Sequence, residues 1–169
     1  MQSIRATIPV STGNRARQAS CRGFTLIELL MVVVILGIMM TLAAPSMSKM
    51  IANQRLKSMA TDLHLTLVKA RGEAIKRNAD VTVSPAGGVW SNGWSLVNPD
   101  SATEPLDVRG PAASVSVTTS ATQVVYRGNG RVTPGSAATF EFTSARTDAT
   151  RCLSVDPSGR PYLKEGACS

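Results

Sequence analysis

A continuous apolar run from Phe24 to Ala44 constrains this chain more than any other feature. Its 21 residues carry one charged side chain, that of Glu28. At about 1.5 Å per residue, a helix of this length is long enough to cross a hydrocarbon core of roughly 30 Å. Residues 24–45 are therefore predicted to form a membrane-spanning helix.

Residues 1–23 form a basic leader in front of this run. They contain four arginines and no acidic residue. Positive charge beside a membrane segment stays in the cytoplasm, so we expect a cytoplasmic leader and a C-terminal part on the other side. A secretory signal peptide is the alternative, but its apolar region would be shorter, and Ala43-Ala44-Pro45 only faintly resembles a cleavage site.

The net charge of +7 overstates how basic the rest of the chain is. All 11 acidic residues lie from Glu28 onward, where 14 of the 18 basic residues remain, so the excess there is three. Charge alone therefore does not predict a nucleic-acid partner. With 169 residues, the chain has room for one compact domain and an accessory segment.

Beyond Pro45 the apolar residues thin to one face of a helix. They recur at spacings of three and four residues, as Leu56, Met59, Leu63, Leu67, Ala70 and Ala74. This pattern predicts that residues 46–78 continue the helix in amphipathic form. Pro45 is expected to bend the helix where the two parts meet.

Residues 79–169 change to short β-branched runs separated by glycine and proline turns. Strands are expected at Val81–Val83, Val89–Trp90, Trp94–Val97, Ser114–Thr118, Thr122–Tyr126, Ala138–Thr143, Cys152–Val155 and Pro161–Lys164. The stretch Asn98–Ala113 is expected to be a long loop. Aromatic residues make up 4% of the chain, so Trp90 and Trp94 are predicted to anchor the core. The fold class is α+β, with the long helix packed on a small antiparallel sheet.

Two of the three cysteines, Cys152 and Cys168, lie beyond the membrane segment, whereas Cys21 lies in the leader. A disulfide between them would close a short loop, which stabilises a fold by about 3 kcal/mol and requires an oxidising compartment such as the periplasm. Two unpaired thiols are the alternative.

The N-terminal motif resembles a known processing signal. Gly23 followed by Phe24-Thr25-Leu26-Ile27-Glu28 and an apolar helix is similar to the class III signal of type IV pilins and pseudopilins. The resemblance implies that a prepilin peptidase cuts between Gly23 and Phe24 and methylates the new amino group of Phe24. It also implies an inner-membrane protein that later joins a pilus or pseudopilus.

The remaining chain resembles the GspH/FimT family of minor pilins and pseudopilins. The resemblance rests on Ile51–Lys57, Ala70–Asn78, the two tryptophans, Tyr126–Arg131 and Arg151–Val155 leading to Ser158-Gly159-Arg160. It implies a type IV pilin-like fold and a minor pilin of a type IV pilus, in the priming or tip complex. A pseudopilin of a type II secretion system is the alternative. Other pilins or pseudopilins are the expected partners, with no enzymatic activity and no cofactor.

Glu28 needs a partner because a charged group at membrane depth is costly, about 2.5–3.5 kcal/mol on insertion scales. The apolar run contains no basic side chain, but cleavage after Gly23 would create an amino group at Phe24. Pairing of Glu28 with the amine of an adjacent subunit would fix the register of helices in a filament. The alternative is that Glu28 only reaches to the membrane interface.

DNA binding is a further alternative, because some members of this family bind DNA through a Gly-Arg-X-Arg step near the C-terminus. Here the stretch reads Gly159-Arg160-Pro161-Tyr162-Leu163-Lys164, so tyrosine replaces the second arginine. Arg160, Tyr162 and Lys164 would share one face of a strand, and Arg146 and Arg151 would extend the patch. Nearby acidic residues dilute it, and solvated surface charge is the ordinary explanation.

Overall fold

The computed structural model of the chain describes residues 23–101 and 103–168, without the side chains of residues 42–45. The predicted leader lies, apart from Gly23, outside the described residues. The chain divides after Met39 into two compact units, which are described separately.

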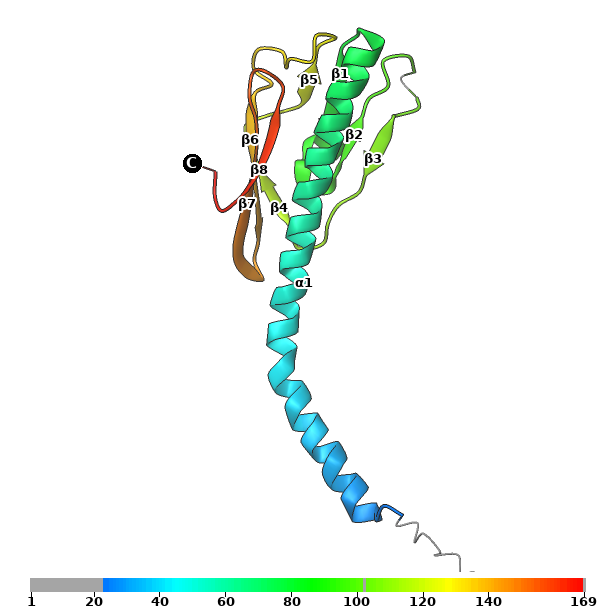
Figure 1. Cartoon of the computed structure of the whole chain (residues 1–169), viewed down its shortest axis with the longest axis vertical. Coiled ribbons are helices and arrows are strands. Elements are labelled where there is room, and N and C mark those ends of the chain that lie inside the picture. Colours follow the sequence, from blue (N-terminus) through cyan, green and yellow to red (C-terminus); the bar gives the residue numbers. More distant parts are fainter. Residues whose placement is uncertain (1–22, 102, 169) are drawn as a thin grey trace, which may run out of the picture. The chain divides into compact units, whose positions relative to one another are not determined.

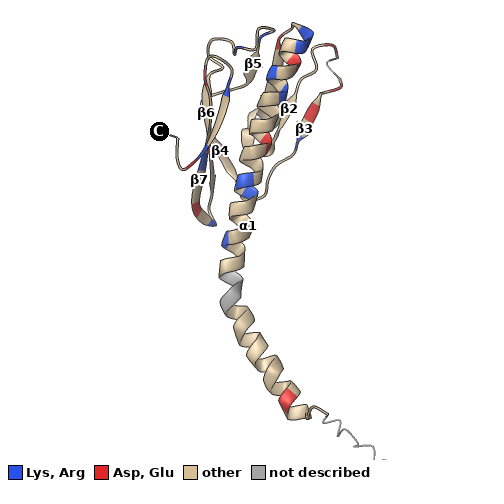
Figure 2. Cartoon of the chain, viewed as in Figure 1, with Lys and Arg blue, Asp and Glu red and all other residues tan. Residues whose placement is uncertain are grey.

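Helix α1 spans Leu26–Arg77 (Figure 1). From Leu26 to Thr41 every side chain is exposed, and the sequence has one charged residue there, Glu28. Figure 2 shows the acidic segment near the start of α1. By length and composition, no one helix in the described part of the chain qualifies as a membrane span. The segments Leu26–Thr41 and Ser46–Arg77 qualify together, as a pair bent at the break between them. Pro45 falls in that break, and its predicted role stays a prediction because its side chain is not described.

The second half of α1 lies in the other unit and buries the predicted stripe. The exposed fractions of Leu56, Met59, Leu63, Leu67, Ala70 and Ala74 are all 3% or less. The helix ends at Arg77 with Asn78 in the left-handed conformation (φ 50°). There the N–H of Ala79 donates to the carbonyl of Ala74 at 3.2 Å, which satisfies one of the last carbonyl groups of the helix.

Within residues 23–101 and 103–168, eight strands form two antiparallel sheets of four strands each, where the sequence predicts one sheet. The first sheet has the order β3-β2-β1-β5, from Asp107–Arg109, Trp94–Leu96, Val81–Pro85 and Val124–Tyr126. The second has the order β4-β6-β7-β8, from Ser116–Thr118, Ala138–Ser144, Thr147–Val155 and Pro161–Glu165. Both sheets contribute to one core with α1, which confirms the α+β class.

Strand β3 corrects the prediction of a long loop over Asn98–Ala113. It pairs at the sheet edge with β2, in the register Ser95↔Val108. Val108 is 62% exposed, so the strand carries no buried apolar side chain that would mark it in the sequence. Pro105 and Pro111 flank the strand without interrupting its hydrogen bonds.

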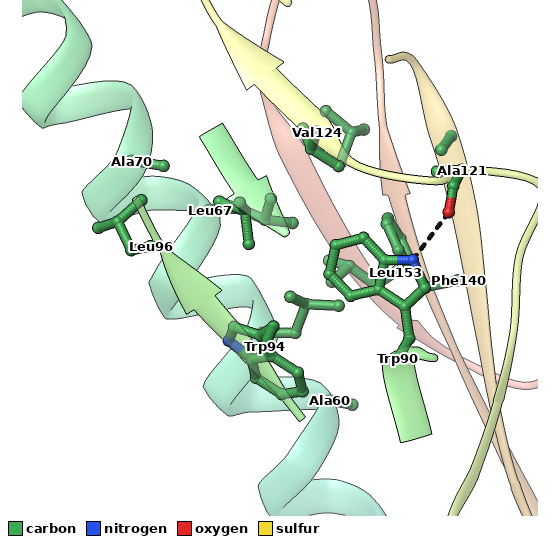
Figure 3. Close-up of a cluster of buried hydrophobic side chains, with 14 of the residues drawn as sticks. Ala60, Leu67, Ala70, Trp90, Trp94, Leu96, Ala121, Val124, Phe140 and Leu153 are labelled. Atoms are coloured by element: carbon green, nitrogen blue, oxygen red, sulfur yellow. Dashed lines mark hydrogen bonds between the residues drawn. The ribbon is translucent and has the colours of Figure 1, made fainter. Parts of the chain in front are cut away.

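The two tryptophans occupy the core, as predicted, although Trp90 begins a 3₁₀ turn, Trp90–Asn92, where a strand was predicted. Its indole N–H donates to the carbonyl of Ala121 at 2.8 Å, and its ring meets Phe140 edge-on at 4.8 Å between centroids (Figure 3). The indole N–H of Trp94 donates to the hydroxyl of Thr66 on α1 at 3.0 Å. Both buried indoles are thus hydrogen-bonded, and the bond of Trp94 ties β2 of the first sheet to α1.

Candidate functional site

The first turn of α1 is organised by Thr25. The Thr25 hydroxyl accepts a hydrogen bond from the backbone N–H of Glu28 at 3.3 Å, and its carbonyl accepts one from the N–H of Leu29 at 3.2 Å. Thr25 is therefore the N-cap, and Glu28 stands at the third helical position, which is the sequence spacing of a capping box. The candidates named from the sequence omit this role of Thr25, although the T-x-x-E spacing is its signal.

The residues around the predicted cleavage point line one depression. Gly23, Phe24, Thr25 and Glu28 enclose about 430 Å³. Gly23 lies outside the helix with open space beside its Cα, and Phe24 is 79% exposed. Glu28 makes no ion pair with any described residue. Its carboxylate thus lies in the same depression as Phe24, at the positive end of the helix dipole.

On β8 the predicted alternation holds. Arg160, Tyr162 and Lys164 are exposed, while Leu163 packs against the core from the other face. The Arg160 guanidinium lies 5.3 Å from the centroid of the Tyr162 ring, a cation–π contact. Arg160, directly before β8, and Tyr162 on the strand therefore present a cation and a ring on one exposed face.

Asp156 shapes the turn that leads into β8. Its carboxylate accepts hydrogen bonds from the N–H of Ser158 at 2.8 Å, the hydroxyl of Ser158 at 2.5 Å and the N–H of Arg160 at 3.2 Å. The Ser158 hydroxyl is the main cause that holds the pKa of Asp156 below its usual range. The acid that seemed to dilute the basic patch instead positions Arg160.

The structure does not bring Arg146 and Arg151 to the Arg160 end. The guanidinium of Arg151 forms an ion pair with Glu165 at 2.8 Å, and its side chain is only 20% exposed. Arg146 lies in the turn between β6 and β7. That turn is separated from the β7–β8 turn by the nine residues of β7, about 30 Å of strand.

Two other arginines lie beside Arg160. Arg127 and Arg131 line a cavity of about 350 Å³ together with Pro157 of the β7–β8 turn. The loop of residues 127–131 packs closely on the β7–β8 turn. The contact is so close that a Cβ added at Gly159 would overlap the carbonyl oxygen of Gly130. Sequence reasoning did not place Arg127 and Arg131 in the basic patch, since only the tertiary contact joins their loop to β8.

The C-terminal tail crosses the outer face of the second sheet. Cys168 is joined to Cys152 of β7 by a disulfide, with 5.0 Å between the Cα atoms. The N–H of Cys168 donates to the carboxylate of Glu141 on β6 at 3.2 Å. Cys152 itself is fully buried.

Comparison with known proteins gives two sequence matches. Residues 59–159 match the family described as type II transport protein GspH, which is more than half of the chain. The chain belongs to the GspH family. Residues 18–44 match the prokaryotic N-terminal methylation motif, which contains Gly23, Phe24 and Glu28. No curated protein matches the sequence.

Solved structures of two pilin-like proteins share the fold of this GspH-family chain. The type IV minor pilin FimU of Pseudomonas aeruginosa is 23% identical, with a TM-score of 0.57, covering 66% of this chain and 90% of its own. The minor pseudopilin EpsH from the type 2 secretion system of Vibrio cholerae is 15% identical, with a TM-score of 0.54, covering 66% and 97%. These likenesses show that the chain has the fold of the two pilin-like proteins, and they do not distinguish the two systems.

Side chains that could bind a metal ion do not cluster in the part of the chain that the structure describes. There, no group of three or more His, Cys, Asp or Glu side chains is placed to hold a metal ion. The features that remain to be explained are the depression at Glu28 and the basic surfaces.

Proposed function

We propose that this GspH-family chain is a minor pilin of a type IV pilus, acting as a priming or tip-complex subunit. The observation that carries the proposal is the start of α1, where an acidic residue on a capped first turn is followed by an exposed apolar helix. An apolar helix exposed on all sides requires a membrane or other helices around it. In this proposal residues 24–45 cross the inner membrane, with the leader in the cytoplasm and residues 79–169 in the periplasm.

Processing between Gly23 and Phe24 is the second part of the proposal. Gly23 stands outside the helix in open space, so a peptidase can reach the bond that follows it. Cleavage would leave the amino group of Phe24 as the new N-terminus, in the depression that Glu28 lines. A prepilin peptidase that methylates this amine is the enzyme we infer.

Pairing between the carboxylate of Glu28 and the amine of Phe24 in an adjacent subunit would then drive assembly. A charge pair buried among apolar helices is costly to break, because slipping the helices leaves both charges unpaired. The carboxylate of Glu28 would therefore set the register of the subunit in the filament.

The test is to replace Glu28 in the native host. Glu28→Val should leave membrane insertion and cleavage largely intact but keep the protein out of pili, because the amine loses its partner. Glu28→Asp, which keeps the charge, is the control and should retain part of the incorporation. Sheared pili and membranes would be probed with antibody, and the N-terminus of the mature protein sequenced by mass spectrometry.

Equal incorporation of Glu28→Val and the parent protein would refute the pairing. A mature protein that still begins at Met1 would refute the processing step.

A pseudopilin of a type II secretion system is the alternative. Deleting the gene distinguishes the two, because loss of surface pili with normal protein secretion indicates a pilus subunit. Loss of secretion with normal pili would assign the chain to the secretion system.

DNA binding for uptake is a second candidate function, favoured by the Arg160–Tyr162 contact beside Arg127 and Arg131. Two or three guanidinium groups and one exposed ring are the groups that hold phosphates and stack on bases. The chain in detergent micelles would be titrated with labelled duplex DNA across a salt series. Weaker binding and a shallower salt slope in the Arg160→Gln, Lys164→Gln variant would support DNA binding. Absence of salt-dependent binding by the parent chain would exclude it.

A further inference from the structure

A second basic surface lies at the end of the domain that is opposite the β7–β8 turn. Two cavities, of about 400 and 120 Å³, adjoin there along α1. Arg55 lines both, and the consecutive residues Ala113 and Ser114 line one each, so the two form one groove. We call it the Arg55 groove.

Three arginines from separate elements converge on the Arg55 groove. Arg55 comes from α1, Arg109 ends β3, and Arg146 occupies the β6–β7 turn. The hydroxyl of Thr147 donates to the amide oxygen of Asn53, which holds that turn against α1. Figure 2 shows basic segments on α1 and at the tip of the β6–β7 hairpin in this part of the domain.

The residues that line the Arg55 groove carry a net positive charge, from three arginines and one acid. The three arginines are exposed, and none forms an ion pair with another residue that the structure describes. Asp62 is the one acidic residue among the lining residues. An anion is therefore the ligand that this groove would take, because guanidinium groups bind phosphate in bidentate fashion.

The position of the groove along the chain indicates which anion. Its lining begins at Ser48, four residues beyond the last residue of the apolar run, which is about 6 Å along a helix. Met47, Met50 and Ile51 are exposed beside it, by 57%, 69% and 45%. Apolar and cationic side chains next to each other suit a lipid surface, whereas a nucleic acid would meet only the charges.

We propose that Arg55, Arg109 and Arg146 bind the phosphate groups of anionic phospholipids in the membrane that anchors the chain. The proposal rests on the membrane anchorage in the proposed function but not on which machine the subunit joins. Basic side chains near an anionic surface attract it strongly, and the attraction falls off within a Debye length. The contact would hold the domain on the membrane before assembly and would be released when the subunit leaves the bilayer.

The test uses the full chain in non-ionic detergent, titrated with phosphatidylglycerol and, as neutral reference, phosphatidylcholine. Bound lipids are counted by native mass spectrometry. We expect preferential binding of phosphatidylglycerol, weakened by between about tenfold and a hundredfold in the Arg55→Gln, Arg109→Gln, Arg146→Gln variant. Inorganic phosphate at the same concentration should not displace the lipid, because it lacks the acyl chains that Met47, Met50 and Ile51 contact.

The matched control is Arg127→Gln, Arg131→Gln, Arg160→Gln, which removes the same charge from the other end of the domain. It should leave phosphatidylglycerol binding unchanged, and near-ultraviolet circular dichroism should show that both variants fold. Equal binding of the two lipids, an equal loss in the control variant, or displacement by inorganic phosphate would overturn the proposal. The proposal would also be overturned if the Arg55→Gln, Arg109→Gln, Arg146→Gln variant lost binding to labelled duplex DNA but kept its binding to lipid.

Failure of this experiment leaves the Glu28 test of assembly intact, because the lipid titration uses uncleaved chain outside any filament. Loss of pilus incorporation, conversely, does not alter lipid binding in detergent.

Discussion

At the scale of single residues, Thr25 and Glu28 show how two functions share one short motif. The side chain of Thr25 satisfies the N–H of Glu28, so the helix can begin directly after the predicted cleavage point. The carboxylate of Glu28 makes no ion pair with another described residue, and we propose that its partner is the amine of an adjacent subunit. The sequence predicts that Glu28 is important, because a charged side chain in a membrane is energetically costly. The cap by Thr25 is seen only in the hydrogen bonds of the first turn.

Gly159 gives a test of the contact that joins the loop of residues 127–131 to the β7–β8 turn. Its φ is +81°, and an added Cβ would overlap the backbone oxygen of Gly130. Gly159→Ala should therefore lower the free energy of unfolding by about 3 kcal/mol, from left-handed strain and overlap together. The measurement is denaturant unfolding followed by tryptophan fluorescence.

Gly135→Ala is the control for this prediction, because its φ is +87° with open space around it. It should cost only the backbone strain, about 1 kcal/mol. Equal effects of the two substitutions would contradict a steric role for the Gly130–Gly159 contact.

At the scale of elements, the second sheet is completed by the tail that follows β8. Cys168 ties the tail to β7 through Cys152 and to β6 through Glu141. Chain entropy makes such a short covalent loop worth about 3 kcal/mol. The sequence shows the two cysteines, but the burial of Cys152 under the tail appears only in the fold.

Removing the disulfide should therefore lower the free energy of unfolding by about 3 kcal/mol. The double variant Cys152→Ala, Cys168→Ala and the parent chain in reducing agent should unfold at similar denaturant concentrations, both below the oxidised parent. An oxidised parent no more stable than the reduced one would contradict a structural role for the bond.

The β7–β8 turn should respond to acid. The pKa of Asp156 is lowered in the folded chain, chiefly by the Ser158 hydroxyl, so the stabilisation is fully present above the ordinary carboxyl pKa. It is lost as the pH falls through the folded pKa, because the protonated acid accepts these hydrogen bonds poorly. Asp156→Asn should thus be less stable than the parent at pH 7, with a difference that shrinks below about pH 4.

Thermal unfolding across a pH series measures this difference. Asp148→Asn, which changes an exposed aspartate near the other end of β7, is the matched control and should not show the same pH dependence. A constant difference for Asp156→Asn down to low pH would mean that the turn does not depend on the ionised carboxylate.

At the scale of the whole molecule, the division after Met39 separates an exposed apolar segment from a unit with its own core. The buried apolar residues begin at Ala52 and draw on α1 and both sheets. The core thus lies entirely in the second unit, while the first unit contributes exposed apolar surface and Glu28.

A fragment of residues 46–169 should therefore fold without detergent. It keeps every buried residue of the core cluster, so we expect a monomer with a single cooperative thermal transition. The full chain should need detergent to stay in solution, because its first helical half exposes apolar side chains throughout. Aggregation of the fragment, or gradual unfolding, would show that the core depends on the first unit.

Local periodicity and spacing in the sequence account for the apolar run, the buried stripe of α1, the α+β class and most of the strands. These signals are local, since each depends on residues within a few positions of one another. Strand β3 was missed because an exposed edge strand buries no alternating apolar side chains. The second sheet was missed because strand partners are set by contacts between segments far apart in the chain.

Because such signals are local, the sequence by itself determined the class of the protein. The signal is the apolar run that begins at Phe24 and contains Glu28. Only the tertiary structure decided which basic residues act together. In the fold, Arg146 lies beside Arg55 and far from Arg160, and Arg151 forms an ion pair with Glu165. Arg127 and Arg131 lie at the β7–β8 turn. Charges on a surface are grouped by folding, because residues that are neighbours in space need not be neighbours in the chain.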